Sequence, residues 1–353
     1  RDSGSDATVV HCTIGVPASA KLVVAAFVVL SMAWPTVANK SFALARDFVS
    51  ESAGWFYSIV VSAALIMCVM LAVGHWGSVR LGADDEKPEF SWLSWTAMLF
   101  AAGMGIGLVF WSIAEPLTHY SGNPLLAAWG PDPSSIVRAH VAMEITFFHW
   151  GLMPWALYAM AGLIFAYFSF RKCEPLTIRS AMRPLIGDNV GRWPGKLADV
   201  VAIVATVFGL ATSLGFGADQ INAGLARLFG WQVSMEHKLL LIAIITGAAV
   251  LSVGSGLERG IRFLSIVNIW LGALILTVVL TSAPLDPMLR NASVRLAEYL
   301  ADLPWLTFET AGNDSGWSAS WTTFYWGWWI SWTPFVGLFI ARISRGRTVR
   351  EFI

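Results

Sequence analysis

Eight apolar runs constrain this 353-residue chain more than any other feature of its sequence. A membrane-spanning α-helix needs about 20 mostly apolar residues, since lipid offers no hydrogen bonds to exposed backbone groups. The runs cover residues 22–38, 55–74, 92–118, 137–169, 198–226, 237–255, 262–283 and 320–341. We therefore predict an all-α integral membrane protein with eight transmembrane helices.

The composition agrees with a membrane protein and excludes several other classes. Hydrophobic residues make up 56% of the chain and charged residues 13%, compared with roughly 25% charged residues in soluble domains. The net charge is zero, so no nucleic-acid partner is indicated and the lipid membrane is the expected environment. The three cysteines and six histidines show no ligand or disulfide spacing, so we predict no cofactor and no enzymatic activity.

Positive charge predicts the orientation. The loop 171–196 carries six Lys or Arg residues, whereas the loop 121–135 carries none. Cytoplasmic loops are rich in Lys and Arg, and a basic run after the eighth helix, residues 342–350, fits the same side. We expect a cytoplasmic N-terminal tail over residues 1–20, without a signal-peptide cleavage pattern, followed by a transmembrane domain over 21–353.

Two helices contain residues that interrupt a simple span. Gly103, Gly105 and Gly107 occupy every second position of the third helix, and Gly327, Pro334 and Gly337 lie in the eighth. Each glycine weakens a helix by about 1 kcal/mol relative to alanine. Close helix packing explains many membrane glycines, but broken helices at matching positions of two repeats are typical of a transporter site.

This pairing predicts an inverted repeat. Helices three to seven would form the first repeat, and helix eight would open the second. We therefore expect the chain to be a C-terminally truncated fragment of a longer transporter. Between the seventh and eighth helices, residues 294–303 alternate apolar and charged side chains at helical spacing, which indicates a helix on the membrane surface.

The most unusual stretch is residues 321–333, which contain five tryptophans in thirteen positions. An indole ring is large and its face attracts cations. A quaternary ammonium group cannot donate a hydrogen bond, so aromatic faces are its usual binding partners. The stretch therefore predicts either membrane anchoring or a site for such a cation.

Three stretches, residues 103–116, 149–158 and 324–347, resemble the betaine/carnitine/choline transporter family. The resemblance implies a twelve-helix inverted-repeat fold like that of the leucine transporter, a homotrimer, and a place in the bacterial inner membrane. It further implies a symporter that imports a quaternary ammonium compatible solute, glycine betaine above all, coupled to sodium ions.

The resemblance also assigns site residues. It implies a central aromatic box formed by Trp150, Trp155, Tyr158 and Trp329, with Trp332 and Trp328 along the substrate path. The unwound stretch of Gly103, Met104, Gly105 and Gly107 can offer backbone N–H groups to the carboxylate of the substrate, because broken helix ends carry partial positive charge.

Two sodium sites follow from the same resemblance. Carbonyl groups of Ala101 and Met104 would help to hold one ion, and Thr206, Leu210 and Phe335 match the positions of a second. Leu210 has no side-chain oxygen, so the chain departs from the family pattern there. Thr212 or Ser213 could replace it, and coupling to one sodium ion or to protons also becomes plausible.

Other functions stay open. A proton-coupled choline importer and a carnitine/butyrobetaine exchanger are alternatives within transport, although some proton-coupled choline members carry an acidic residue at the position of Gly107. A membrane osmosensor or receptor that binds such solutes without moving them is the alternative from another class.

Charged and histidine side chains inside the predicted spans require their own explanation, because ionisable groups in a membrane are functional candidates by default. They are Glu115, His119, Glu144, His149 and Asp219. None of the three carboxylates lies near the middle of a span, so we expect structural pairing or capping for them in preference to a proton relay. For His119 and His149 we expect neutral packing or hydrogen bonding.

Overall fold

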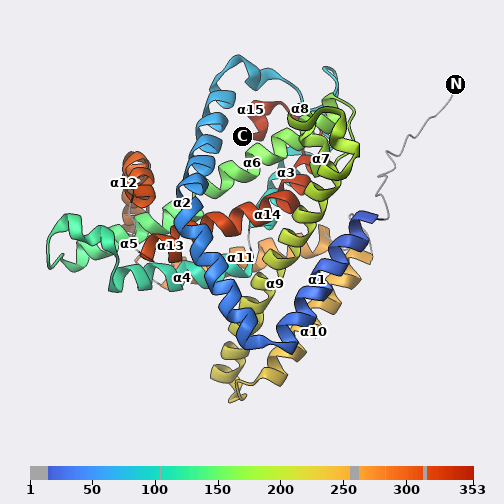
Figure 1. The fold of residues 1–353 in the computed structure, drawn as a ribbon. Coiled ribbons are helices and arrows are strands. Elements are labelled where there is room, and N and C mark those ends of the chain that lie inside the picture. Colours follow the sequence, from blue (N-terminus) through green and yellow to red (C-terminus); the bar gives the residue numbers. More distant parts are fainter. Residues whose placement is uncertain (1–14, 104, 255–261, 283, 313–315) are drawn as a thin grey trace. The chain divides into compact units, whose positions relative to one another are not determined.

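The computed structural model describes residues 15–103, 105–254, 262–282, 284–312 and 316–353 (Figure 1). Within these residues it is almost entirely helical and contains no β-strand, apart from one isolated bridge between Arg80 and Thr348. The chain forms two compact units, which we describe separately. Unit 1 comprises Arg1–Glu89, Leu152–Gly209 and Glu309–Ile353, and unit 2 comprises Phe90–Gly151 and Leu210–Phe308.

The tryptophan-rich stretch lies almost entirely in α14, which is one of the helices of unit 1. They are α1 (Gly15–Ala33), α2 (Pro35–Val73), the 3-10 helix η1 (His75–Ser78), α6 (Leu152–Ala166), the π-helix η3 (Tyr167–Arg171), α7 (Ile178–Ala181), α8 (Arg183–Ile186), the 3-10 helix η4 (Gly187–Gly191), α13 (Gly316–Ser320), α14 (Thr322–Ile343) and α15 (Val349–Phe352). Helix α9 (Trp193–Phe229) belongs to unit 1 as far as Gly209.

Unit 2 holds the rest of α9 and seven further elements. They are α3 (Trp92–Gly103), α4 (Ile106–Ser121), the 3-10 helix η2 (Pro124–Trp129), α5 (Ser135–Trp150), α10 (Met235–Gly254), α11 (Arg262–Ser282) and α12 (Leu285–Gly312), the last as far as Phe308. Helix α4 packs along α5, and α3 packs along α11.

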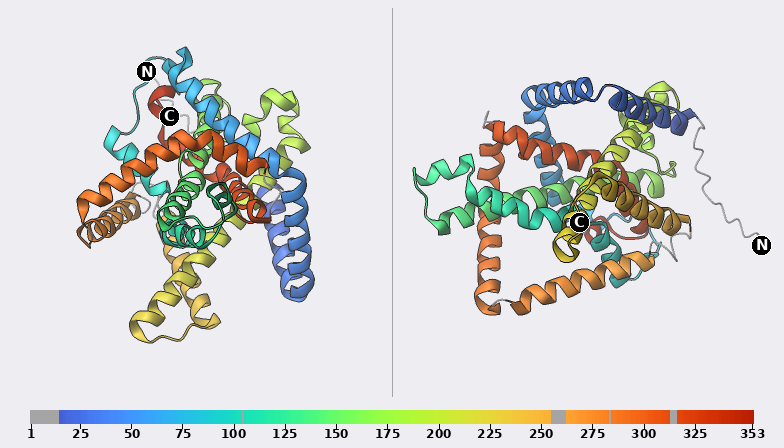
Figure 2. Two further views of the ribbon diagram at one scale, coloured as in Figure 1. Left: turned by 90° about the vertical axis from the view of Figure 1, so that its left-hand side faces the viewer. Right: turned by 90° about the horizontal axis from the view of Figure 1, so that it is seen from below.

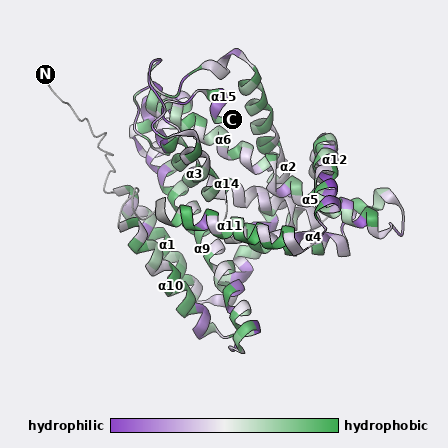
Figure 3. Ribbon diagram, turned by 180° about the vertical axis from the view of Figure 1, so that it is seen from behind, coloured by the Kyte–Doolittle hydropathy of each residue, from purple (hydrophilic) through white to green (hydrophobic). Residues whose placement is uncertain are grey.

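Each of the eight predicted apolar runs contains α-helix. Among the described residues, five helices are long and apolar enough to cross a membrane, or up to seven if two sharply bent pairs each count as one span. Many large apolar side chains on these helices are exposed, among them Leu251 of α10 and Trp270 of α11, and Figure 3 shows hydrophobic residues covering much of both helices. Such surfaces suit lipid, and the exact number of spans stays a prediction.

The first two helices have different bounds from those predicted. Helix α1 begins at Gly15 and ends at Ala33, so residues 15–20 of the predicted tail are helical. Residues 1–14 lie outside the described part. Pro35 occupies the first position of α2, where its fixed φ is favourable, and it disfavours helix at the preceding Trp34. Helix α2 then runs 39 residues, through polar positions such as Lys40 that are good helix formers.

The core of unit 1 lies where α14 crosses α6, with α2 alongside both (Figure 1). The two helices approach closely because each contributes a glycine. A Cβ on Gly162 would lie 2.6 Å from Ile340 Cγ1, and a Cβ on Gly337 would lie 2.9 Å from the Cβ of Ala161. Close packing therefore explains Gly337, and the predicted break of the eighth helix is wrong, because α14 runs on through Pro334.

The basic run after α14 is paired with the acidic loop after α2. The backbone N–H of Leu81 donates to Arg347 at 2.8 Å, and the N–H of Gly346 donates back to Leu81 at 2.8 Å. Arg342 forms an ion pair with Glu89 at 2.6 Å. The loop after α2 thus holds the end of α14 in place.

The predicted surface helix at 294–303 lies within α12. The axes of α11 and α12 differ by 114°, and Figure 2 shows the two helices running in different directions. Of the cysteines, Cys68 is buried and Cys173 exposed, and both are free, while Cys12 lies outside the described residues.

Candidate functional site

The third apolar run is interrupted at the predicted glycines. Helix α3 ends at Gly103 and α4 begins at Ile106, with their axes 56° apart. Gly105 between them is extended, at φ −103° and ψ 172°. A Cβ on Gly105 would meet no atom of unit 2 within 4 Å, so close packing does not require glycine there. Met104 lies outside the described residues.

The fourth apolar run is also interrupted, contrary to the predicted single helix over 137–169. Helix α5 ends at Trp150, and Gly151 adopts a non-helical φ of −89° and ψ of −128°. Helix α6 begins at Leu152, and Pro154 in its first turn needs no intrahelical N–H partner. Trp150 consequently belongs to unit 2, whereas Trp155 and Tyr158 belong to unit 1.

Three of the four predicted box residues come together in unit 1. The ring of Tyr158 lies 5.9 Å from that of Trp155, at an interplanar angle of 86°. It lies 6.3 Å from that of Trp329, at 84°. Helices α6 and α14 thus place three rings with Tyr158 nearly perpendicular to each of the other two. Trp155 is the most accessible of them, 40% exposed, while Tyr158 and Trp329 are buried.

Several other rings of α14 stack on one another. Trp328 and Trp329 stack at 5.1 Å with planes only 6° apart, and Tyr325 stacks on both. Trp326 is 1% exposed. The tryptophan-rich stretch is therefore a packed aromatic cluster, in which Trp329 is the member that also reaches the ring of Tyr158.

Trp332 and Phe335 lie near the predicted second sodium site. Their rings are 5.9 Å apart, and a Cβ on Gly209 of α9 would lie 2.7 Å from Trp332 Nε1. Thr206 lies one turn before Gly209, and its hydroxyl donates to the carbonyl of Ala202 at 2.8 Å. Leu210 belongs to unit 2, as does Ala101 of the predicted first site.

Trp150 is held by a buried carboxylate. Its indole N–H donates to Glu115 Oε2 at 2.7 Å, while the other oxygen of Glu115 lies 2.6 Å from His149 Nδ1. His119 Nε2 lies 3.4 Å from the same oxygen. Glu115, His119 and His149 are fully buried. This cluster ties α4 to the end of α5 and orients a predicted box residue.

We expect Glu115→Ala to lower the free energy of unfolding by about 3 kcal/mol, because two buried donors lose their acceptor at about 1–3 kcal/mol each. Thermal and denaturant unfolding in detergent micelles would measure the loss. Thr118→Ala, an exposed position of the same helix, is the control and should change stability by at most about 0.5 kcal/mol. Equal stability of the two variants would contradict the anchoring role of Glu115.

The expected structural pairing of the other charged residues is confirmed. Asp219 forms an ion pair with Lys238 at 2.7 Å, and Glu144 lies 3.3 Å from His140 Nε2. Sequence reasoning did not identify Glu115 as the partner of Trp150, because 35 positions separate them. The His140 and Glu144 pair has a readable signal, since four residues bring side chains together on a helix.

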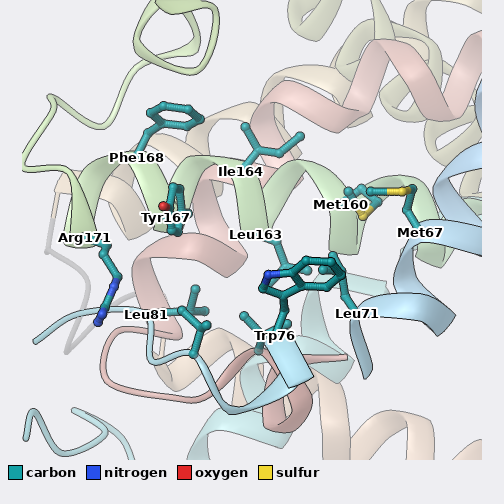
Figure 4. A pocket seen from close by; sticks show the side chains of 12 residues that line it. Met67, Leu71, Trp76, Leu81, Met160, Leu163, Ile164, Tyr167, Phe168 and Arg171 are labelled. Atoms are coloured by element: carbon teal, nitrogen blue, oxygen red, sulfur yellow. The ribbon is translucent and has the colours of Figure 1, made fainter. Parts of the chain in front are cut away.

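Unit 1 also contains an apolar groove of about 600 Å³, lined by residues of α2, η1, α6 and η3 (Figure 4). Met67, Met160 and Leu163 are typical of its walls. Its charged member is Arg171, whose guanidinium pairs with Asp84 at 2.6 Å.

Residues 15–353 match the family model described as BCCT, betaine/carnitine/choline family transporter. A glycine betaine transporter of Bacillus subtilis is 45% identical over 312 residues, covering 88% of this chain and 60% of that protein.

Two further relatives are similar. A glycine betaine/proline/choline transporter of Vibrio parahaemolyticus is 41% identical over 339 residues, covering 93% of this chain and 61% of that protein. An uncharacterized transporter of Mycobacterium tuberculosis is 44% identical over 343 residues, covering 96% and 57%. The chain therefore spans about three fifths of the length of these relatives.

Proposed function

This chain belongs to the betaine/carnitine/choline transporter family, and from that premise we propose that it imports a quaternary ammonium solute, most directly glycine betaine. The proposed process is secondary active transport and involves no covalent chemistry. The relatives named for glycine betaine transport support this substrate class.

The observation that carries the proposal is the arrangement of Trp155, Tyr158 and Trp329. A trimethylammonium group has no N–H to donate, so hydrogen bonds cannot select it, whereas aromatic faces attract its charge. Rings at nearly right angles, 86° and 84° to Tyr158, can contact such a round cation from several sides. Trp150, oriented by Glu115, is the fourth residue proposed for this box.

The opposite end of the substrate is a carboxylate and requires donors. Gly105, at the break between α3 and α4, is extended, and the N-terminus of α4 carries partial positive charge. We assign the carboxylate to this break, with Gly105 and Gly107 beside it. Trp328 and Trp332 are the proposed residues of the path.

Sodium is the proposed coupling ion. Thr206 offers a hydroxyl oxygen on the face of α9 that meets Trp332 and its neighbour Phe335. Ala101 at the end of α3 offers a carbonyl group for the other ion. Leu210 contributes no side-chain oxygen to the second site. We therefore propose coupling to at least one sodium ion and do not require two.

Uptake by the full-length protein in proteoliposomes tests the function. Glycine betaine should accumulate when an inward sodium gradient is imposed, and accumulation should stop when potassium replaces sodium, because the ion supplies the driving force. Protein-free liposomes are the control. Uptake driven by a proton gradient, or only by exchange for internal solute, would overturn sodium coupling. Binding without uptake would overturn transport and indicate an osmosensor.

A further inference from the structure

Two helices of unit 2 present pairs of metal-ligand side chains to each other. Helix α5 carries His140 and Glu144, and α12 carries Glu298 and Asp302. Each pair is four residues apart, so both members lie on one helix face. One ligand atom from each of His140, Glu144 and Asp302 lies within 4.8 Å of the other two.

Hydrogen-bond acceptors crowd this cluster. Glu144 is only 2% exposed, and no hydrogen-bond donor among the described residues reaches its Oε1 atom. The side chain of Asp302 interacts directly with it. Two carboxylates side by side repel each other unless a proton or a metal cation lies between them. A proton shared between Glu144 and Asp302 or a bound cation would relieve this repulsion, and the imidazole of His140 beside the two carboxylates favours the cation.

The surroundings of His140 fit a metal ligand. Its Nε2 lies 3.3 Å from Glu144 Oε2, and its Nδ1 lies 3.0 Å from Glu298 Oε2. A carboxylate on the far nitrogen is the usual partner of a metal-bound histidine, since it orients the ring. Arg295 pairs with Glu298 at 2.7 Å and also contacts His140 Nδ1.

We propose that His140, Glu144 and Asp302 bind one divalent transition-metal ion, of the class of zinc. Imidazole nitrogen with carboxylate oxygens is a zinc-type ligand set, whereas calcium and magnesium favour oxygen alone. The cluster contains three carboxylates, those of Glu144, Glu298 and Asp302, and the guanidinium of Arg295. These groups leave two negative charges, which a divalent cation balances.

The other cluster of histidines and a carboxylate in unit 2 does not need a cation. Both oxygens of Glu115 already accept short hydrogen bonds, from His149 and Trp150. The two clusters therefore differ in whether their buried carboxylate oxygens already accept hydrogen bonds from donors. The second cluster also provides a matched control, because His119 belongs to it and not to the proposed site.

The proposed ion joins α12 to the middle of α5. Tyr299, one residue after Glu298, is buried and lies 5.9 Å from the ring of Phe147. Its hydroxyl would lie 3.1 Å from a Cβ on Gly151. Metal binding therefore stabilises the contact between these two helices, independently of which solute the protein transports.

The test uses the purified full-length protein, treated with a chelator and then titrated with zinc against a metal indicator. We expect one zinc ion per chain and a higher melting temperature with zinc. Glu298→Gln should weaken zinc binding by about 10–100-fold, as expected for loss of a partner of a metal ligand. His140→Ala and Asp302→Asn, which remove ligands, should weaken it further.

Two controls keep the result interpretable. His75→Ala, at an exposed position of unit 1, and His119→Ala should leave the zinc affinity unchanged. Melting curves without zinc identify any variant that fails to fold, and X-ray absorption of the wild-type complex should report one nitrogen and carboxylate oxygens around zinc. Absence of zinc binding by the wild type, or binding that survives Asp302→Asn and is lost in His119→Ala, would overturn the proposal.

Discussion

Gly337→Leu should prevent α14 from packing on α6 and abolish recovery of folded protein. A Cβ at this position would lie 2.9 Å from both the Cβ of Ala161 and Cε2 of Phe165. The remaining atoms of leucine have no space, because α6 and α14 are in contact there, and overpacking costs about 1–3 kcal/mol even for small additions. Size-exclusion chromatography of the detergent-solubilised protein would measure the yield of folded material.

A graded series of substitutions distinguishes steric overlap at Gly337 from a general sensitivity of α14 to substitution. Gly337→Ala should retain a reduced folded fraction, since only one methyl group overlaps its neighbours. Gly327→Ala, on the same helix, places its Cβ where no atom of unit 1 lies within 4 Å. It should be neutral or stabilising by up to about 1 kcal/mol, because alanine favours helix. Folding of Gly337→Leu at the wild-type level would contradict the close crossing.

Trp329→Leu should weaken binding of glycine betaine by about 30-fold. Loss of a desolvated cation–π contact costs about 2 kcal/mol, and about 1.4 kcal/mol corresponds to a tenfold change in the dissociation constant. Trp329 is the ring of α14 that contacts Tyr158, at 6.3 Å. Isothermal titration calorimetry on the full-length protein would measure the affinity.

An uncharged substrate analogue distinguishes the cation–π contribution from lost packing. In the analogue a tert-butyl group replaces trimethylammonium, so shape is kept and charge is removed. Trp329→Leu should affect the analogue much less than glycine betaine, and Trp329→Phe should restore part of the affinity for glycine betaine. Equal losses for both ligands would mean that Trp329 only packs, and unchanged affinity would exclude it from the box.

The sequence predicts the aromatic density of α14 but not the orientation of its rings. The composition of residues 321–333 predicts aromatic density, and helical spacing shows that its rings cannot all face one cavity. It does not indicate that Trp328 stacks on Trp329 with planes 6° apart. Ring orientation depends on side-chain rotamers chosen against the neighbouring helix, and that information lies in α6, far away in the chain.

The helix breaks show the same limit. Three alternating glycines predicted the break at Gly105, because glycine weakens a helix locally. Gly151 is a lone glycine in a long apolar run, so the sequence did not predict a helix end there. The end of α5 follows from the non-helical backbone of Gly151. Gly337 was misread as a break, since a glycine that permits close packing and one that ends a helix look alike in sequence.

The sequence by itself determined that this is an α-helical membrane protein of the betaine/carnitine/choline transporter family, because hydrophobic length and local motifs are properties of contiguous residues. Only the tertiary structure decided which side chains meet. The partnership of Glu115 with Trp150, the crossing at Gly162 and Gly337, and the cluster of His140, Glu144 and Asp302 all join separate helices. Such contacts depend on how helices pack, and a one-dimensional pattern does not encode that directly.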